Sequence, residues 1–273
     1  MEYPLVFFTV LSQLAAGAMV TLWLLDTFTD KVDVASGRLA AQSIVGITAL
    51  SLLVSLFHLG HPLNAYRALT NIGSSWVSRE VALFTLFLLA AIVYCSFWKD
   101  TGRSLRIKTG GVTALIAVLA VLASAMVYVL PARPAWNNIS PIVFFLLTAA
   151  LLGPLYIGIL FRFRGQAVPV PLNFTGAVLA TSLLVFMVYV SVLLSGQDAG
   201  YQTGLKLIHS GAFWIRAVSG WLVPLAMFFL LVAKRGLAEK NLVTYLFILT
   251  LVGEIIGREL FYSSVVALQV GMF

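Results

Sequence analysis

Long apolar segments follow one another along nearly the whole chain, separated by short polar stretches. Each has about the 20 predominantly apolar residues that a helix needs to cross a bilayer. The apolar residues run continuously instead of alternating with polar ones, which excludes a β-barrel. We therefore predict an all-α integral membrane protein, a bundle of eight transmembrane helices forming a single domain over residues 1–273. The expected helices are residues 4–25, 38–59, 78–98, 109–130, 141–161, 171–194, 211–233 and 241–266.

The amino-acid composition leads to the same class of protein. Of the 273 residues, 61% are hydrophobic and only 10% are charged, and the mean hydropathy is +1.02. A soluble domain keeps about a quarter of its residues charged, so this protein has too little polar surface to face water on every side. The net charge of +7 does not indicate a nucleic-acid partner, because in a membrane protein an excess of Lys and Arg is first a topology signal.

The basic residues divide unevenly between the two sides of the predicted bundle. Eleven of the 17 lie in the connections that follow the odd-numbered segments, and six lie on the opposite side. Cytoplasmic loops carry the excess of Lys and Arg, so we expect an N-out, C-out topology. The richer side holds Lys31, Arg38, Lys99, Arg103, Arg106, Lys108, Arg162, Arg164, Lys234, Arg235 and Lys240, and the other side holds Arg67, Arg79, Arg133, Lys206, Arg216 and Arg258.

One stretch at the expected outer boundary gathers most of the candidate chemistry. His58 and His61 flank Gly60, where a ligand or another backbone can approach closely, and Arg79 and Glu80 begin the next helix. A neutral imidazole and a carboxylate in a partly dry site can accept and relay protons. In the alternative interpretation, Arg79 and Glu80 only anchor their helix, whose dipole favours a carboxylate in the first turn.

The loop between these groups predicts a short helix at the membrane surface. Pro62 can occupy its first turn, Leu63, Tyr66 and Leu69 recur at a spacing of three, and Gly73 ends the pattern. Such a helix would cover whatever the ends of the second and third spans enclose.

The last apolar segment contains a second candidate group. Glu254, Arg258 and Tyr262 are spaced four residues apart, so they share one face of a helix. A charge near the middle of a span is costly unless it is paired, so we predict an intramembrane pair between Glu254 and Arg258. The pair either fixes the rotation of this helix or lines a polar path or ligand pocket.

Small residues and prolines add local expectations for helix packing. Pro154 and Pro224 fall inside the fifth and seventh segments and should kink them. Glycines that suit close contacts between helices are Gly17, Gly46, Gly176, Gly253 and Gly257.

Resident redox centres can be judged from the Cys and His residues. One cysteine, Cys95, excludes an internal disulfide and an iron–sulfur cluster held by the protein's own thiolates. A two-haem bundle of the b type needs four axial histidines within its helices, whereas this sequence has three, His58, His61 and His209, all at one boundary. We therefore expect no haem, cluster or metal ion in this protein, and an ordinary interfacial hydrogen bond for His209.

Three motifs occur in a fixed order along the sequence. They are residues 57–62 (Phe-His-Leu-Gly-His-Pro), residues 75–80 (Ser-Trp-Val-Ser-Arg-Glu) and residues 253–258 (Gly-Glu-Ile-Ile-Gly-Arg), the last followed by Phe261 and Tyr262. Together they resemble the membrane-anchor subunit of the dimethyl sulfoxide reductase family (DmsC-like). The similarity extends from end to end in helix count, length and motif order.

The resemblance implies an anchor of eight helices in a bacterial cytoplasmic (inner) membrane. Such an anchor binds an iron–sulfur electron-transfer subunit and a molybdopterin catalytic subunit, and it does not act alone on the terminal substrate. It oxidises menaquinol from the quinone pool during anaerobic respiration and passes the electrons to the iron–sulfur subunit. Carried over by position, the two catalytic residues are His58 and Glu80. The expected quinol-binding set is His58, Gly60, His61, Arg67, Arg79 and Glu80.

One position departs from the family pattern. The family commonly has a basic residue two positions after the proline, where this sequence has Asn64, and Arg67 could supply the charge from the same face. On the residues alone, two other classes of function stay open. One is a proton-coupled secondary transporter or channel, suggested by Glu254 and Arg258, and the other is a purely structural membrane tether. The polar groups crowd one boundary and no inverted repeat is evident, which speaks against a transporter.

Overall fold

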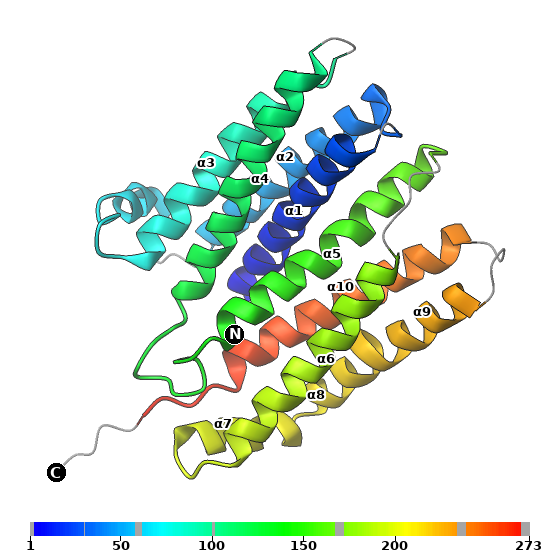
Figure 1. Ribbon diagram of the computed structural model, residues 1–273. Coiled ribbons are helices and arrows are strands. Elements are labelled where there is room, and N and C mark those ends of the chain that lie inside the picture. The colour runs from blue at the N-terminus through cyan, green and yellow to red at the C-terminus, as the bar shows by residue number, and fades with distance from the viewer. Residues whose placement is uncertain are drawn as a thin grey trace.

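The computed structural model describes residues 3–29, 31–57, 62–99, 102–166, 172–233 and 239–268, and its regular elements over these ranges are all helical (Figure 1). Within the same ranges, seven helices are long and apolar enough to cross a membrane. The predicted all-α class is thus confirmed for the part of the sequence that the structure describes. The protein is a multi-pass membrane protein.

The helices follow the first six predicted spans, with ends within four residues of the prediction except at the start of α4, which lies six residues earlier. Their bounds are α1 (Tyr3–Phe28), α2 (Val34–Leu56), η1 (Pro62–Leu69, a 3-10 helix), α3 (Trp76–Ser96), α4 (Arg103–Met126), α5 (Ser140–Phe163), α6 (Leu172–Leu194), α7 (Ala199–His209), α8 (Gly211–Arg216), η2 (Ala217–Leu222, a π-helix), α9 (Val223–Ala233) and α10 (Glu239–Ser263).

The last third of the sequence differs most from the prediction. The sequence did not predict α7, which follows the N-cap Asp198, whose side chain accepts a hydrogen bond of 2.8 Å from the Gly200 amide. The seventh predicted span is present as one apolar helical stretch, Gly211–Leu230, within which the π-helical turn η2 separates α8 from α9. The eighth, α10, contains Glu254, Arg258 and Glu259 and is not among the seven apolar helices, although it packs along α5 inside the bundle (Figure 1).

The π-helical turn η2 lies directly before the predicted distortion at Pro224. A proline has no N–H to donate to the carbonyl four residues earlier, here that of Gly220, and its ring also crowds that carbonyl. The α-helical pattern cannot pass through this point unchanged. A π turn, which often marks a functional site, takes up the irregularity just ahead of the proline.

The bundle is organised around α1. This helix contacts α2 and α4 on one side and α5 and α10 on the other, so it joins a first group of helices (α1–α4) to a second group (α5, α6, α8, α9 and α10), as Figure 1 shows. Buried residues lie on every side of α1. A helix that is apolar all round belongs in a core, which explains the central position of α1.

The joint between α1 and α5 depends on two glycines. A Cβ atom added at Gly17 would lie 1.9 Å from the carbonyl oxygen of Ala149, and one added at Gly153 would lie 2.1 Å from the Gly17 carbonyl carbon. The backbones therefore touch, as small residues permit in membrane bundles. The expectation of a close contact at Gly17 is confirmed, whereas that at Gly46 is wrong, since nothing lies within 4 Å of a Cβ there.

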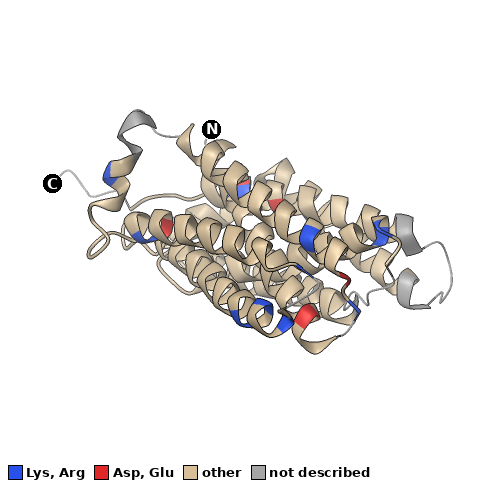
Figure 2. Ribbon diagram, turned by 90° about the horizontal axis from the view of Figure 1, so that it is seen from above, with Lys and Arg blue, Asp and Glu red and all other residues tan. Residues whose placement is uncertain are grey.

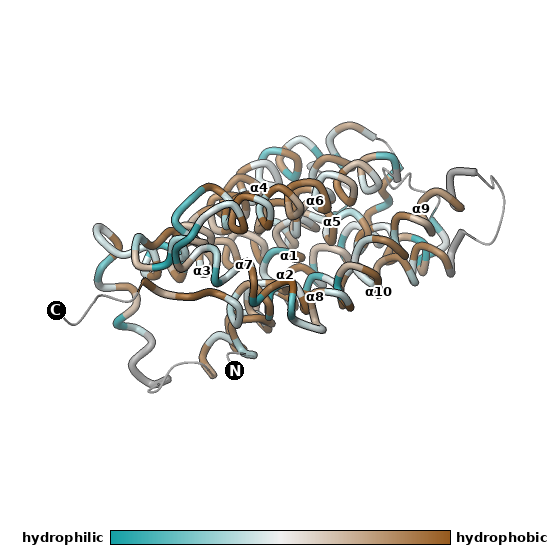
Figure 3. Tube along the Cα trace, turned by 90° about the horizontal axis from the view of Figure 1, so that it is seen from below, coloured by the Kyte–Doolittle hydropathy of each residue, from teal (hydrophilic) through white to brown (hydrophobic). Residues whose placement is uncertain are grey.

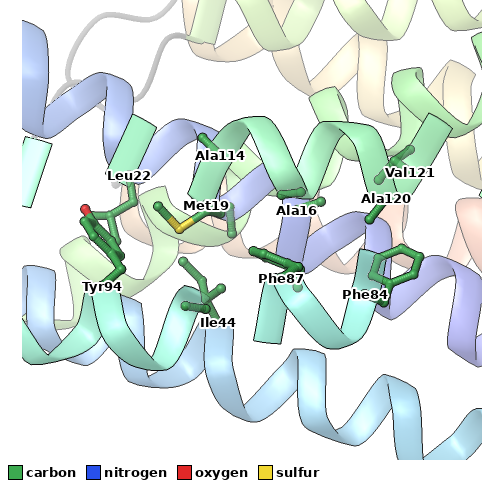
Figure 4. Close-up of a cluster of buried hydrophobic side chains, with 14 of the residues drawn as sticks. Ala16, Met19, Leu22, Ile44, Phe84, Phe87, Tyr94, Ala114, Ala120 and Val121 are labelled. Atoms are coloured by element: carbon green, nitrogen blue, oxygen red, sulfur yellow. The ribbon is translucent and has the colours of Figure 1, made fainter. Parts of the chain in front are cut away.

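Inside the first group, aromatic and aliphatic side chains fill the space that small residues leave open. Figure 4 shows Phe84 and Phe87 of α3 in one cluster with Ala16 of α1 and Ala120 of α4. On the outside, large apolar side chains such as Leu53 are exposed around the bundle. Apolar residues extend along the helices in Figure 3, and charged residues are sparse in Figure 2. Such an exterior suits lipid, and it is not the surface of a soluble monomer.

Candidate functional site

The first motif of the expected site lies outside the residues that the structure describes, and with it His58, Gly60 and His61. A short helix is confirmed at the predicted place as η1, which begins at Pro62 and has the three-residue period of a 3-10 helix, although it ends at Leu69, before the predicted end at Gly73. Arg67, in its last turn, is exposed.

Arg79 fastens the loop that connects η1 to α3. Its Nε donates to the Ile72 carbonyl at 2.9 Å, its Nη2 donates to the Gly73 carbonyl at 2.6 Å, and its Cζ lies 4.3 Å from the centre of the Trp76 ring. These contacts occupy much of the guanidinium's donor capacity. Arg79 also borders an open groove of about 580 Å³ between α3 and α4, whose other walls are mainly apolar.

Glu80 points the opposite way, into the bundle. Its side chain is only 6% exposed, and Oε1 accepts a hydrogen bond of 2.5 Å from the Ser124 hydroxyl on α4. Helix α3 begins with Ser75 as its N-cap, which places Arg79 and Glu80 in the first helical turns on different faces. A carboxyl group with one hydrogen-bond donor and little water can bind or release a proton in an otherwise apolar region.

A pair of hydrogen-bonded tyrosines joins α10 to the segment that follows α4. Tyr262 is on α10, and Tyr128 lies just beyond the end of α4. The Tyr262 hydroxyl donates to the Tyr128 hydroxyl at 2.9 Å, and the Tyr262 hydroxyl also lies 3.4 Å from the Thr9 hydroxyl of α1. Ser124, which donates to Glu80, precedes Tyr128 by four positions in the chain. Three helices that are far apart in the sequence thus bring their polar groups together.

Aromatic rings surround this tyrosine pair. Trp136, from the α4–α5 connection, stacks on Phe261 with ring centres 4.8 Å apart and planes 18° apart, and it meets Tyr128 edge-on at 5.3 Å. The segment after α10 holds this wall in place, because the Leu268 amide donates to the Ala132 carbonyl at 2.9 Å. Beside the rings an open pocket of about 390 Å³ is lined by both tyrosines.

Deeper in the bundle, Glu254 and Arg258 of α10 meet polar and charged side chains of other helices in a buried group that we call the central cluster (Gln13, Thr148, Arg216, Glu254 and Arg258). Glu254 forms an ion pair with Arg216 at 3.5 Å and accepts a hydrogen bond of 2.5 Å from the Thr148 hydroxyl. Arg258 donates to Gln13 Oε1 at 2.7 Å and to Thr148 at 3.4 Å. Its guanidinium also lies over the Phe145 ring, at 3.7 Å.

The spacing of Glu254 and Arg258 predicts a direct pair, and the geometry differs. Among the described residues, the ion pair of Glu254 is with Arg216, and the Thr148 hydroxyl lies between Glu254 and Arg258. The reason is steric. A Cβ at Gly257 would lie 1.7 Å from Arg216 Nη1, so the missing side chain admits Arg216 to the surface of α10. The neighbouring Gly253 packs directly against Gly220 of η2.

The central cluster is incompletely paired. Gln13 Nε2, Arg216 Nε and Arg258 Nη1 are buried donors without a hydrogen-bond partner within the described part of the protein. A small cavity of about 30 Å³ adjoins both arginines and Glu254. That space is enough for a water molecule, which is the ordinary partner of such donors.

Sequence reasoning missed several of these residues. Arg216 and Gln13 are polar residues within apolar segments, and that signal alone could have identified them. Ser124 and Thr148 carry no comparable signal, because a hydroxyl in a membrane helix usually satisfies itself on its own backbone. His209 is the last residue of α7, and its Nδ1 lies 2.9 Å from the Leu205 carbonyl oxygen, which is the hydrogen bond expected of it.

Comparison with known proteins gives one consistent result. The family model described as "DMSO reductase anchor subunit (DmsC)" matches residues 1–264. The protein is 30% identical over 279 residues to the C subunit of the anaerobic dimethyl sulfoxide reductase of Haemophilus influenzae, a match that covers 96% of this protein and 94% of the relative. Two proteins of Escherichia coli K12 are 28% identical with the same coverage, the anaerobic dimethyl sulfoxide reductase subunit YnfH over 284 residues and the C subunit of the anaerobic dimethyl sulfoxide reductase over 272 residues.

Proposed function

The protein belongs to the DMSO reductase anchor subunit (DmsC) family, and from this premise we propose that it oxidises menaquinol and passes the electrons to an iron–sulfur subunit. That subunit would supply a molybdopterin catalytic subunit of the same complex. The protein has one cysteine, too few to hold an iron–sulfur cluster by its own thiolates. Its contribution is therefore to hold the quinol, receive its protons and place it near a partner's redox group.

The observation that carries this proposal is the buried Glu80 carboxyl with its Ser124 donor, at the end of the bundle that holds both η1 and the α4–α5 connection (Figure 1). Oxidation of one quinol releases two electrons and two protons. The electrons leave one at a time to the iron–sulfur partner, while the protons need acceptors beside the ring. Glu80 and His58 would each accept one, since the unperturbed pKa of histidine, about 6.5, lies near working pH.

We further propose that α10 is the eighth span, in a bacterial inner membrane, with both termini outside. The 11-to-6 division of basic residues supports this orientation, and α10 runs the length of the bundle beside α5 (Figure 1). In a Cys95→Ser background, single cysteines at Ser104 and Gln197, both exposed, should differ toward an impermeant thiol reagent in intact cells. Only position 197 should react, and labelling at 104 alone would reverse the orientation.

The decisive experiment compares quinol-linked and dye-linked reduction in the assembled complex. The dye feeds electrons directly to the partner subunits, so it reports assembly independently of the anchor. His58→Arg places a permanent cation where a proton acceptor is needed, and Glu80→Gln removes the carboxylate but keeps its size. Each should lower quinol-linked turnover by about 100-fold or more and leave dye-linked turnover unchanged.

A matched control is His209→Arg, because this histidine is exposed and its hydrogen bond is to the backbone of its own helix. It should retain normal quinol-linked turnover. Normal turnover in a well-assembled His58→Arg complex would remove His58 from the site. If the unaltered complex assembles but quinol never reduces the partner, the protein is a tether, and the proposed function fails as a whole.

A further inference from the structure

The aromatic pocket at the end of α10 has a shape and chemistry that the other cavities lack. It measures about 390 Å³, within the range of small-molecule sites. Its walls include Tyr3, Tyr128, Arg133, Trp136, Glu259 and Tyr262, so flat apolar faces alternate with hydroxyl and charged groups. An aromatic ring that carries hydroxyl groups at its edge is the ligand that such a lining recognises.

Two other cavities are less suitable for a head group. A cavity of about 500 Å³ lies between α1, α4, α5 and α6, and its lining is almost entirely aliphatic. The Thr21 hydroxyl in its wall already donates to the Gly17 carbonyl at 2.8 Å. In the groove between α3 and α4, Arg79 is engaged by two backbone carbonyls. Either space could accommodate a hydrocarbon tail, whereas only the aromatic pocket offers hydroxyl partners beside aromatic walls.

The tyrosine pair connects this pocket to Glu80. Tyr262 borders the pocket, and its hydroxyl donates to the Tyr128 hydroxyl at 2.9 Å, which leaves the Tyr128 proton available to a further acceptor. Tyr128 lies two residues beyond the last residue of α4 and four positions after Ser124, which donates to Glu80, so the short stretch of chain between them keeps the two residues near each other. Polar groups thus follow one another from Tyr262 in the pocket wall through Tyr128 and Ser124 to the buried carboxyl.

We propose that the aromatic pocket holds the head group of the quinol, and that Tyr262 and Tyr128 relay one of its protons to Glu80. This proposal rests on the function proposed above. As the quinol hydroxyl releases its proton to the Tyr262 oxygen, Tyr262 passes its own proton to Tyr128, and Tyr128 passes its own to Glu80, directly or through one water. Both tyrosines end neutral, and the quinol's two electrons go to the iron–sulfur subunit. The second proton leaves separately, as in the function proposed above.

Tyrosine-to-phenylalanine variants of the intact complex test the relay with little change in volume. With a short-chain naphthoquinol as substrate, Tyr262→Phe and Tyr128→Phe should each lower kcat by about 10-fold to 100-fold, with dye-linked turnover unchanged. The control is Tyr189→Phe, since Tyr189 is also buried but donates to the Ala135 carbonyl at 3.1 Å and does not border this pocket. Its kcat should stay within about 2-fold of the unaltered complex.

Occupancy of the pocket has a readout apart from turnover. Trp136 lies in its wall, so titration with the oxidised short-chain naphthoquinone should quench tryptophan fluorescence, and Trp136→Phe should remove most of that saturable change. Filling the pocket with Ser263→Phe should raise both the quinone concentration for half-maximal quenching and the KM for the quinol by about 10-fold.

The outcomes separate this inference from the function on which it rests. If the unaltered complex oxidises quinol while both tyrosine variants keep normal kcat, the relay is overturned. If quenching survives Trp136→Phe and Ser263→Phe leaves KM unchanged, the head group binds elsewhere, and quinol oxidation by the protein still stands. If the unaltered complex oxidises no quinol, the proposed function itself fails.

Discussion

Two clusters of buried charged residues in the bundle differ in how completely their charges are paired. At the end of the bundle that would face the cytoplasm in the proposed orientation, Arg106 of α4 donates two hydrogen bonds of 2.9 and 2.7 Å to the Asp26 carboxylate of α1. Arg106 is only 4% exposed and Asp26 only 2%. Arg103 adds a hydrogen bond of 2.7 Å to the Asp26 carbonyl, and the Trp98 ring lies 4.1 Å from the Arg106 guanidinium. Every oxygen of this carboxylate has a near-ideal donor.

The central cluster has the opposite character. The Arg216–Glu254 ion pair is 3.5 Å long, Arg258 has an amide and a hydroxyl as partners instead of a carboxylate, and three buried donors have no partner among the described residues. A fork-shaped pair such as Asp26–Arg106 is specific and rigid. A loose cluster beside a small cavity keeps capacity for water and for rearrangement. The comparison indicates a rigid ion pair at one end, Asp26 with Arg106, which we call the clamp. It indicates a polar, adaptable region near the proposed quinol site.

The largest effect should come from breaking the clamp. Asp26→Asn would leave the buried Arg106 without its counter-charge, at a cost of about 3–5 kcal/mol in stability. Thermal unfolding of the purified complex in detergent measures it. Replacing both residues by apolar ones, Asp26→Leu with Arg106→Met, should recover most of the loss, because the paired charges are then removed together. If the double variant is the less stable of the two, the clamp does not act as a pair.

The next effect tests the space that admits Arg216 to the central cluster. Gly257→Ala would place a methyl group on the guanidinium, 1.7 Å from Nη1, and force Arg216 out of its ion pair. We expect a loss of about 2–3 kcal/mol. Gly46→Ala is the matched control, since a Cβ there meets nothing within 4 Å, and it should leave stability unchanged or slightly raised. Equal effects of the two substitutions would contradict the proposed fit of Arg216.

A smaller effect should follow from removing the hydroxyl that joins Glu254 to Arg258. Thr148→Val keeps the shape of the side chain and deletes a hydrogen bond of 2.5 Å to Glu254. We expect a loss of about 1.5 kcal/mol. Thr250→Val, in the same bundle, deletes only hydrogen bonds to its own helix backbone and should cost clearly less. Similar losses from both would show that Thr148 contributes no more than an ordinary helix hydroxyl.

The smallest effect provides a reference outside the membrane core. Asp33 caps α2 by accepting a hydrogen bond of 2.8 Å from the Ser36 amide. Burial raises the pKa of Asp33, but hydrogen bonds from Ser36 and Ala35 and the charge of Arg164 outweigh it, so the pKa lies below its ordinary value. Asp33→Ala should cost about 1 kcal/mol at neutral pH.

The pH dependence of this cap has a definite sign. Because the folded pKa is depressed, the contribution is complete above the unfolded pKa of about 3.9 and is lost as the pH falls through the folded value. The difference in unfolding temperature between Asp33→Ala and the unaltered protein should therefore shrink in that acidic window. A difference that persists below it would show that the cap acts without its charge.

The sequence predicts the spans well because hydropathy alone decides which residues can contact lipid, and six helices follow the predicted segments closely. It predicts less where partners are chosen in three dimensions. The spacing of Glu254 and Arg258 favours a pair on one helix, yet Gly257 opens α10 to Arg216. Ser124 and Tyr128 become site residues only because α4 packs beside Glu80, which no local pattern records.

The π turn η2 has a consequence for how this protein tolerates changes in length. A π turn holds one residue more than the α-helical turn it replaces, so deleting a single residue within Ala217–Leu222 would give α8 and α9 one continuous register. That deletion would also turn Arg216 by about 100° relative to α9, away from Glu254. Loss of one amino acid here would leave the hydropathy profile almost unaltered, yet it would break the Arg216–Glu254 ion pair that joins α8 to α10. Lineages of this protein should therefore accept substitutions in this stretch more readily than deletions.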